Sequence, residues 1–258
     1  MRFQLFAARL ALVLLALAIV SALAALGGVR LALIDFSNGF LVMAGASALA
    51  LLALGMALLW GYGAFQHNRG EGKRAGLTAL LGSMVLLAAP LHTTYMSLTS
   101  PAIHDATTDP EDPPQFVALA KARKPGMNSP VYDGSEEITF RGETNTANYI
   151  LHTYYLVPRI TSPHVELRPP LNTKPAMFWH AFETVKNLGW TIVDYSEKDG
   201  RIEATAQSFW FGQTADIVIR VEEAGAQGSR LDARSQSESG ARDFGSNIAR
   251  LKDLRDAL

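Results

Sequence analysis

Residues 98–114, LTSPAIHDATTDPEDPP, divide the chain into two parts of different character. Four prolines keep this stretch out of a regular helix, because each lacks a backbone N–H and most restrict the preceding residue. Residues 1–100 carry only six Lys or Arg and two acids. Residues 101–258 carry 17 Lys or Arg and 22 acids, and they have the composition of a water-soluble domain. The stretch therefore marks the boundary between an apolar region and a polar one.

Composition excludes several classes of function. A nucleic-acid-binding protein needs a basic surplus to displace counterions, and the polar part of this chain is mildly acidic. The chain contains no cysteine, which rules out disulfides, thiolate catalysis and thiolate metal sites. A chain without cysteine is compatible with an oxidising compartment but does not require one.

Three apolar runs precede the boundary: Phe6–Leu26, Gly39–Phe65 and Ala75–Leu98. Each is long enough to cross roughly 30 Å of hydrocarbon as a helix. A cleaved signal peptide is the alternative for the first run, but its apolar stretch is too long and ends in a poor cleavage site. The sequence therefore predicts an N-terminal three-helix transmembrane bundle over residues 1–98.

Positive charges predict the orientation of these spans. Arg2 and Arg9 lie at the N-terminus, and Arg69, Lys73 and Arg74 lie between the second and third spans. Loops rich in Lys and Arg stay on the cytoplasmic side of a membrane. We therefore expect a multi-pass protein of the cell inner membrane, with a cytoplasmic N-terminus and a periplasmic C-terminal domain.

The polar part divides into an irregular region and a regular one. Residues 99–172 are rich in Pro, Gly, Ser and Asn, and we interpret them as a linker with short helices. Residues 173–258 show helical spacing, then four alternating strand patterns, then helical spacing again. The predicted elements are helices 173–189 and 244–257 and strands 190–195, 201–207, 216–221 and 230–236. This order predicts an α+β domain with an antiparallel sheet of about four strands and helices on one face.

Four blocks of this region resemble a known family. They are IHDATTDPEDPP (103–114), LGWTIVDYSEKDGRIEATAQSFWFG (188–212), DIVIRV (216–221) and LDARSQSESGARDFGSNIARL (231–251). Together they resemble the family catalogued as domain of unknown function 1499, found in bacteria and plastids. The resemblance implies hydrophobic N-terminal segments in an envelope or thylakoid setting, and it implies no particular reaction. A looser likeness to helix-grip modules concerns the fold alone. The tyrosine-rich segment 133–170 departs from the family pattern.

The acidic stretch contains candidate metal ligands: His104, Asp105 and Asp109. Carboxylates on a stiff loop suit a hard cation, and the histidine suits a transition metal. The spacing does not match the twelve-residue calcium loop, however, and Asp-Pro commonly begins a turn. We favour structural turns over a metal site.

Arginines form a second candidate site. Arg201, Arg220 and Arg234 alternate onto the outward face of the predicted sheet. The last helix adds Arg242, Asn247 and Arg250, near a helix start where free N–H groups attract anions. Together they would bind a phosphate or carboxylate, such as an anionic lipid or glycan. Cross-strand charge pairing is the alternative, and we favour it because each arginine has an acidic neighbour.

The third candidate site is the connection between two predicted strands, which contains the aromatic residues Phe209, Trp210 and Phe211. They either fold under the domain as a lid on its core, which we favour, or enter the headgroup zone of the membrane, where tryptophan is common.

No motif indicates catalysis or a cofactor. The chain lacks the G-x-S-x-G elbow, the H-E-x-x-H zinc motif and a phosphate-binding glycine loop. The leading hypothesis is therefore a non-enzymatic, membrane-anchored envelope module that binds a protein partner or an anionic ligand. The alternatives are a metal-assisted hydrolase built on residues 104–112 and an accessory subunit of a larger membrane complex.

Overall fold

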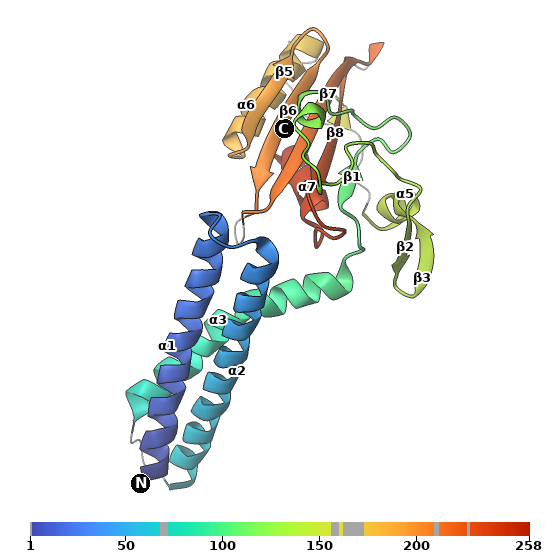
Figure 1. Ribbon diagram of the computed structural model, residues 1–258. Helices are drawn as coiled ribbons and strands as arrows, with labels where there is room; N and C mark the ends of the chain where they lie inside the picture. The colour runs from blue at the N-terminus through green and yellow to red at the C-terminus, as the bar shows by residue number, and fades with distance from the viewer. Residues whose placement is uncertain (1, 68–71, 156–159, 162–172, 209–211, 226–227) are drawn as a thin grey trace. The chain divides into compact units, whose positions relative to one another are not determined.

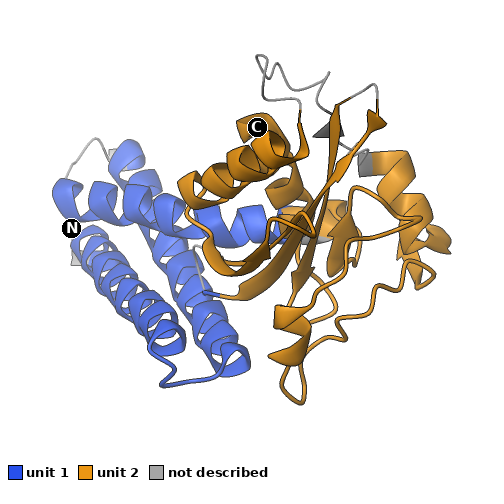
Figure 2. Ribbon diagram, turned by 90° about the horizontal axis from the view of Figure 1, so that it is seen from above, with its two compact units in different colours: residues 1–95, 209–212 blue, residues 96–208, 213–258 orange. Residues whose placement is uncertain are grey.

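Figure 1 shows the computed structural model of the chain, which describes residues 2–67, 72–155, 160–161, 173–208, 212–225 and 228–258. The chain divides into two compact units (Figure 2). One comprises Met1–Tyr95 with Phe209–Gly212, and the other comprises Met96–Ser208 with Gln213–Leu258.

The first unit is built from three long apolar helices, as the sequence predicts. They are α1 (Arg2–Arg30), α2 (Phe36–His67) and α3 (Lys73–Thr99). All three are long and apolar enough to cross a membrane. The Asp35 side chain accepts the backbone N–H of Asn38 at 2.9 Å, and this bond caps the start of α2. The three apolar helices are consistent with the predicted anchor.

Small residues allow these helices to pack closely. Ala11, Ala57 and Ala79, one from each helix, meet in a buried cluster. A Cβ placed on Gly82 of α3 would lie 2.5 Å from the Leu15 side chain of α1, closer than real atoms approach. Small residues at such contacts replace the hydrophobic driving force that is missing in lipid.

The second unit contains a six-stranded antiparallel sheet in the order β1-β8-β7-β6-β5, with β4 also paired to β8. Its strands are β1 (Asp105–Thr107), β4 (Ile160–Thr161), β5 (Thr191–Ser196), β6 (Arg201–Gln207), β7 (Thr214–Glu223) and β8 (Ser229–Ser237). The four predicted strands correspond to β5 to β8, so the predicted α+β class is confirmed.

Two helices cover the apolar face of this sheet. α6 (Lys174–Asn187) begins where the Thr173 hydroxyl accepts the Ala176 N–H, and the chain leaves it through Gly189 at φ +74°. α7 (Ser246–Ala257) is the last element. The two helices and the sheet share one core, which includes Phe178, Ala181, Val185, Ile202, Ile217, Ile219, Leu231, Leu251 and Leu254.

Short elements lie between β1 and α6. They are α4 (Ala118–Lys121), the hairpin of β2 (Glu137–Phe140) and β3 (Glu143–Thr146), α5 (Ala147–Ile150) and a π-helical turn, η1 (Leu151–Tyr155). Ile138, Phe140, Ile150 and Leu151 are buried in the main core.

Two sheet strands come from residues that the sequence analysis assigns to a linker. β1 has three residues and β4 has two, which is too short for an alternating pattern to identify them. Both pair with β8, so the sheet extends beyond the module predicted for residues 173–258.

Candidate functional site

A single segment covers the sheet face opposite α6 and α7. This segment, Thr108–Asp133, contains α4, and we call it the strap; it is drawn in green in Figure 1. It makes side-chain and backbone contacts with alternate residues of β6, β7 and β8. The strap and the sheet therefore enclose a layer of charged side chains.

Arg234 of β8 is the centre of this layer and is fully buried. Its Nε donates to Asp105 Oδ1 at 2.9 Å, and its Nη2 donates to Asp105 Oδ2 at 2.7 Å. The same Nη2 donates to the strap carbonyl of Pro130 at 2.9 Å. The guanidinium carbon also lies over two aromatic rings, 4.7 Å from the centroid of Phe116 and 5.2 Å from that of Tyr132.

This geometry corrects the expectation that Arg234 lies on an outward, solvated face. Arg234 lies on the sheet face that the alternation of the strand predicts, but the strap covers this face. Burial raises the pKa of the Asp105 carboxyl, and the paired Arg234 guanidinium opposes that rise.

Glu203 of β6 holds the strap by its backbone. Its carboxylate is fully buried and accepts the N–H groups of Val117 at 2.9 Å, Ala118 at 3.1 Å and Leu119 at 2.8 Å. Arg201 Nη1 donates to the same carboxylate at 2.6 Å. The carboxylate of a sheet residue thus caps α4, a helix of only four residues.

The other predicted sheet arginines are also ion-paired within the unit. Arg220 contacts Asp112 at 2.8 Å and both Asp109 and Asp232 at 3.3 Å. Arg201 contacts Asp194 at 2.5 Å as well as Glu203. Arg201, Arg220 and Arg234 therefore join the sheet to neighbouring strands and to the strap, and they do not converge on a single ligand position.

Two of the three predicted metal ligands are paired with arginines. Asp105 is paired with Arg234, and Asp109 is paired with Arg220. The nearest carboxylate recorded for His104 is Glu136, 3.9 Å from its Nδ1. Within the described ranges, no group of three or more His, Asp or Glu side chains is arranged to hold a metal ion.

A second buried ion pair, which was not predicted from the sequence, links the strap to β7. Arg123 Nη2 lies 2.8 Å from Asp216 Oδ2, with both side chains almost completely buried. Burial raises the pKa of Asp216 to about 6; Arg123 opposes the rise, and the charges of Glu238 and Glu203 add to it. The alternation of Asp216 with Arg220 along β7 is the sequence signal that could have placed it on this face.

The start of α7 is occupied by a side chain of the protein. Asp243 Oδ1 accepts the Gly245 N–H at 2.8 Å, and Oδ2 accepts the Asn247 N–H at 2.6 Å. Two of the N–H groups at the predicted anion site are therefore bonded to a carboxylate of the protein itself. Burial raises the pKa of the Asp243 carboxyl, and these N–H donors oppose the rise.

Asn247, a predicted ligand residue, is fully buried and serves as an internal link. Its Nδ2 donates to the His104 carbonyl at 2.8 Å and to Ser237 Oγ at 3.1 Å. Its Oδ1 accepts from Ser235 at 2.7 Å and from Arg250 Nη1 at 2.9 Å. Asn247 therefore positions the Arg250 side chain.

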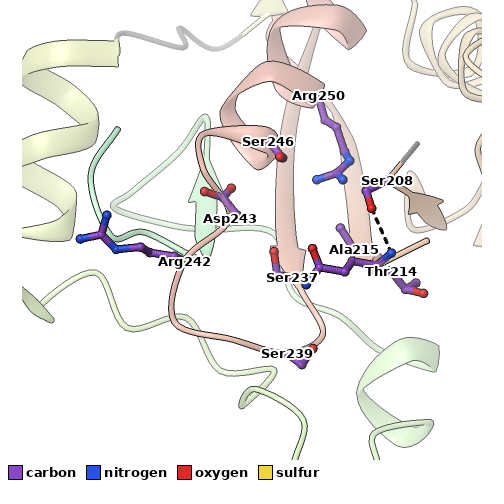
Figure 3. Close-up of a pocket in the computed structure, with 10 residues that line it drawn as sticks. Ser208, Thr214, Ala215, Ser237, Ser239, Arg242, Asp243, Ser246 and Arg250 are labelled. Atoms are coloured by element: carbon purple, nitrogen blue, oxygen red, sulfur yellow. Dashed lines mark hydrogen bonds between the residues drawn. The ribbon is translucent and has the colours of Figure 1, made fainter. Parts of the chain in front are cut away.

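A small open pocket lies beside this link, between the strand ends and α7 (Figure 3). Its lining is mostly hydroxyl-bearing and polar: Ser208, Gln213, Thr214, Ala215, Ser237, Ser239, Arg242, Asp243, Ser246 and Arg250. Figure 3 shows the Arg250 guanidinium directed toward Ser208 and Thr214, whereas the Arg242 side chain points away. Arg250 is therefore the cation of this pocket.

Arg250 differs from the sheet arginines in its partners. Its one recorded side-chain hydrogen bond is to the neutral Asn247, and no described carboxylate lies within 4 Å of it. Burial lowers the pKa of Arg250, and the more distant Asp243 and Asp253 charges oppose the change. The third predicted candidate, Phe209, Trp210 and Phe211, lies outside the described residues.

A family model for "Protein of unknown function (DUF1499)" matches residues 105–258. The chain belongs to the DUF1499 family. The match begins at Asp105, the first residue of β1, so the DUF1499 module includes the strap, the charged layer and the Arg250 pocket. Neither the characterised proteins nor the solved structures yielded a match to this chain.

We expect the Arg234–Asp105 pair to dominate the stability of the DUF1499 module. Asp105→Asn leaves a buried guanidinium without its counter-charge and should lower the free energy of unfolding by about 3–5 kcal/mol. Arg234→Met should have a similar effect, and the double variant should lose less than the sum of the two. Urea unfolding of the full chain in mild detergent, followed by tryptophan fluorescence, measures the coupling.

Asp194→Asn is the matched control. Asp194 also pairs with an arginine, but its side chain is 41% exposed, so its loss should change the free energy of unfolding by about 1 kcal/mol or less. Strictly additive effects of the Asp105 and Arg234 substitutions would contradict the role assigned to the pair.

The raised pKa of Asp216 predicts an unusual pH dependence. Between the unfolded value of 3.8 and the folded value of about 6, the native module binds the proton more tightly than the unfolded chain. This contribution to stability is therefore lost as pH rises from about 4 to about 6. Asp216→Asn should flatten the unfolding free energy across this window.

Asp133→Asn is the control for this experiment. Hydrogen bonds from Ser135 lower the pKa of Asp133, which gives its contribution the opposite pH slope, so Asp133→Asn should not flatten the loss of stability between pH 4 and pH 6. An unchanged slope in the Asp216→Asn variant would show that Asp216 ionises at its ordinary pKa.

Proposed function

We propose that this protein is a membrane-anchored DUF1499 module that binds an anionic component of the cell envelope on the outer side of the inner membrane. The observation that carries the proposal is the Arg250 pocket. It supports a binding role, and the absence of a recognised catalytic motif in the sequence favours binding over catalysis.

Arg250 supports anion binding because, in the part of the chain that the structure describes, no carboxylate is a direct counter-charge to it. Removing a cation from water costs free energy that an ion pair normally offsets. Arg201, Arg220 and Arg234 obtain this compensation from Asp or Glu. An anion in the pocket would provide the same compensation for Arg250, and the hydroxyl groups around it are suitable hydrogen-bond donors.

The proposed compartment rests on the distribution of charge around the apolar helices. Arg2 and Arg9 precede the apolar core of α1, and Lys73 and Arg74 begin α3. With three crossings, both clusters lie on the cytoplasmic side only if the C-terminal module is periplasmic. The N-terminus is then cytoplasmic.

Reporter fusions test this orientation. Alkaline phosphatase joined after Leu258 should be active, because it folds only outside the cytoplasm, and green fluorescent protein at the same position should be dark. Fusions between α2 and α3 should give the opposite pair of results. A fluorescent C-terminal fusion with an inactive phosphatase would overturn the assigned compartment.

Anion binding is tested with inorganic phosphate as the probe. Phosphate should raise the unfolding temperature of the full chain in non-ionic detergent, because a ligand that binds only the native state stabilises it. Arg250→Gln should remove this increase at constant ionic strength. Arg255→Gln is the matched control, since Arg255 lies on the same helix but pairs with Asp256 at the surface. Equal increases in wild type and Arg250→Gln would indicate a general salt effect and would contradict the proposal.

A further inference from the structure

The main sheet ends at β5, and in the part of the chain that the structure describes no further strand pairs with the outer edge of β5 (Figure 1). β5 has six residues, whereas β1 at the opposite end of the sheet has three. An edge strand presents unpaired backbone N–H and C=O groups, which readily pair with another strand. The outer edge of β5 is therefore a place where a further strand can add to the sheet.

β5 has little of the charge that usually protects an edge strand. Natural edges are commonly protected by lysine, by proline or by a bulge. β5 contains neither lysine nor proline, and its one charged side chain, Asp194, pairs with Arg201 at 2.5 Å. A bulge is present, because the register with β6 shifts between Ile192 and Asp194. Residues 194–196 follow the bulge in regular register, so we expect a further strand to pair along this half of β5.

Exposed aromatic side chains lie at the same edge. Tyr195 of β5 is 50% exposed, and Trp179 of α6 is 42% exposed. Their ring centroids are 6.2 Å apart, and the ring of Phe182 lies 5.0 Å from that of Tyr195. Among β1 and β5 to β8, the exposed large apolar side chains are Val193 and Tyr195, and both belong to β5. Aromatic residues are enriched in protein interfaces, so this edge has the composition of a contact surface.

A second copy of the chain is a partner that this edge fits. A two-fold axis places a surface against itself, so the surface must be complementary to its own copy. Tyr195 would meet the same apolar ring. Asp194 is already paired with Arg201, and Glu183 of α6 is paired with Lys186 at 2.9 Å, so neither carboxylate is left to repel its own copy. If the three apolar helices cross a membrane, they also hold both copies in one plane, which raises their effective concentration.

We infer that two copies of this protein associate by antiparallel pairing of β5 with β5 of the other copy, with the two-fold axis at Tyr195. The two sheets then form one continuous sheet, and Trp179 and Phe182 of each copy flank the paired tyrosines. The inference goes beyond the proposed function and does not rest on it, because none of these residues lines the Arg250 pocket.

Disulfide crosslinking tests the pairing directly, because the chain contains no cysteine. Opposed residues of antiparallel strands have Cα atoms about 4.5–5.5 Å apart, a separation that a disulfide spans. Tyr195→Cys in the full chain, mildly oxidised in the membranes of the cells that express it, should form a disulfide-linked dimer. Tyr149→Cys is the matched control and should stay largely unlinked, since Tyr149 is 49% exposed but lies on α5.

The mass of the full chain in mild detergent measures association without a crosslink. Wild type should have the mass of two chains. Tyr195→Lys removes the aromatic pair and places two like charges opposite each other, so the dissociation constant of the dimer should rise about 10-fold or more. Tyr149→Lys should associate as wild type does. Tyr195 is half exposed, so the lysine should leave the module folded, and the unfolding temperature checks this. The crosslinking result decides the inference if Tyr195→Lys does not fold.

Three results would overturn the inference. The first is a wild-type chain with the mass of a single copy, together with no more crosslinking of Tyr195→Cys than of Tyr149→Cys. The second is a dimer that folded Tyr195→Lys leaves intact, which would place the contact elsewhere, for example between the apolar helices. The third is a disulfide that joins Tyr195→Cys to a different protein, which would show that the edge binds another partner.

Discussion

The buried ion pair between Arg234 and Asp105 is the constraint on which the DUF1499 module depends. A guanidinium with no exposed surface needs a counter-charge and hydrogen-bond acceptors, or its burial is strongly unfavourable. Asp105 supplies the counter-charge from β1, and the Pro130 carbonyl of the strap supplies an acceptor. Arg234 therefore requires β1 to pair beside β8 and the strap to lie over the sheet, and the strap in turn places α4 over Glu203.

The two faces of the sheet consequently differ in polarity. One is apolar and packs against α6 and α7, while the other holds paired charges beneath the strap. On the second face, each of Arg123, Arg201, Arg220 and Arg234 has a carboxylate as a direct counter-charge. Among the described residues no carboxylate lies within 4 Å of Arg250, and this contrast is the reason that we propose a binding site at the strand ends and not on the charged face.

Sequence patterns identified most of the regular structure of the module and little of its site. α6, α7 and strands β5 to β8 were predictable because helical and alternating spacing are local signals over many residues. β1 and β4 were too short for such a signal. Arg242, Asn247 and Arg250 were all named from the start of the last helix, but spacing alone does not distinguish the buried link, Asn247, from the cation that faces the pocket, Arg250.

The spacing of apolar residues along the chain was sufficient to predict three long apolar helices and an antiparallel α+β module, because both follow from the period of neighbouring residues. Which charges neutralise one another became visible only in the folded chain. Arg234 and Asp105 are 129 positions apart in the chain. The acidic residues of the strap also pair with an arginine that is far away in the sequence. Even a short separation was not predictable: Asp243 is only four residues from Asn247, and its carboxylate accepts N–H groups at the start of α7 that we had expected to attract a ligand. Pairing depends on where the folded chain places each group and on how much water remains around it, and no local period encodes either quantity.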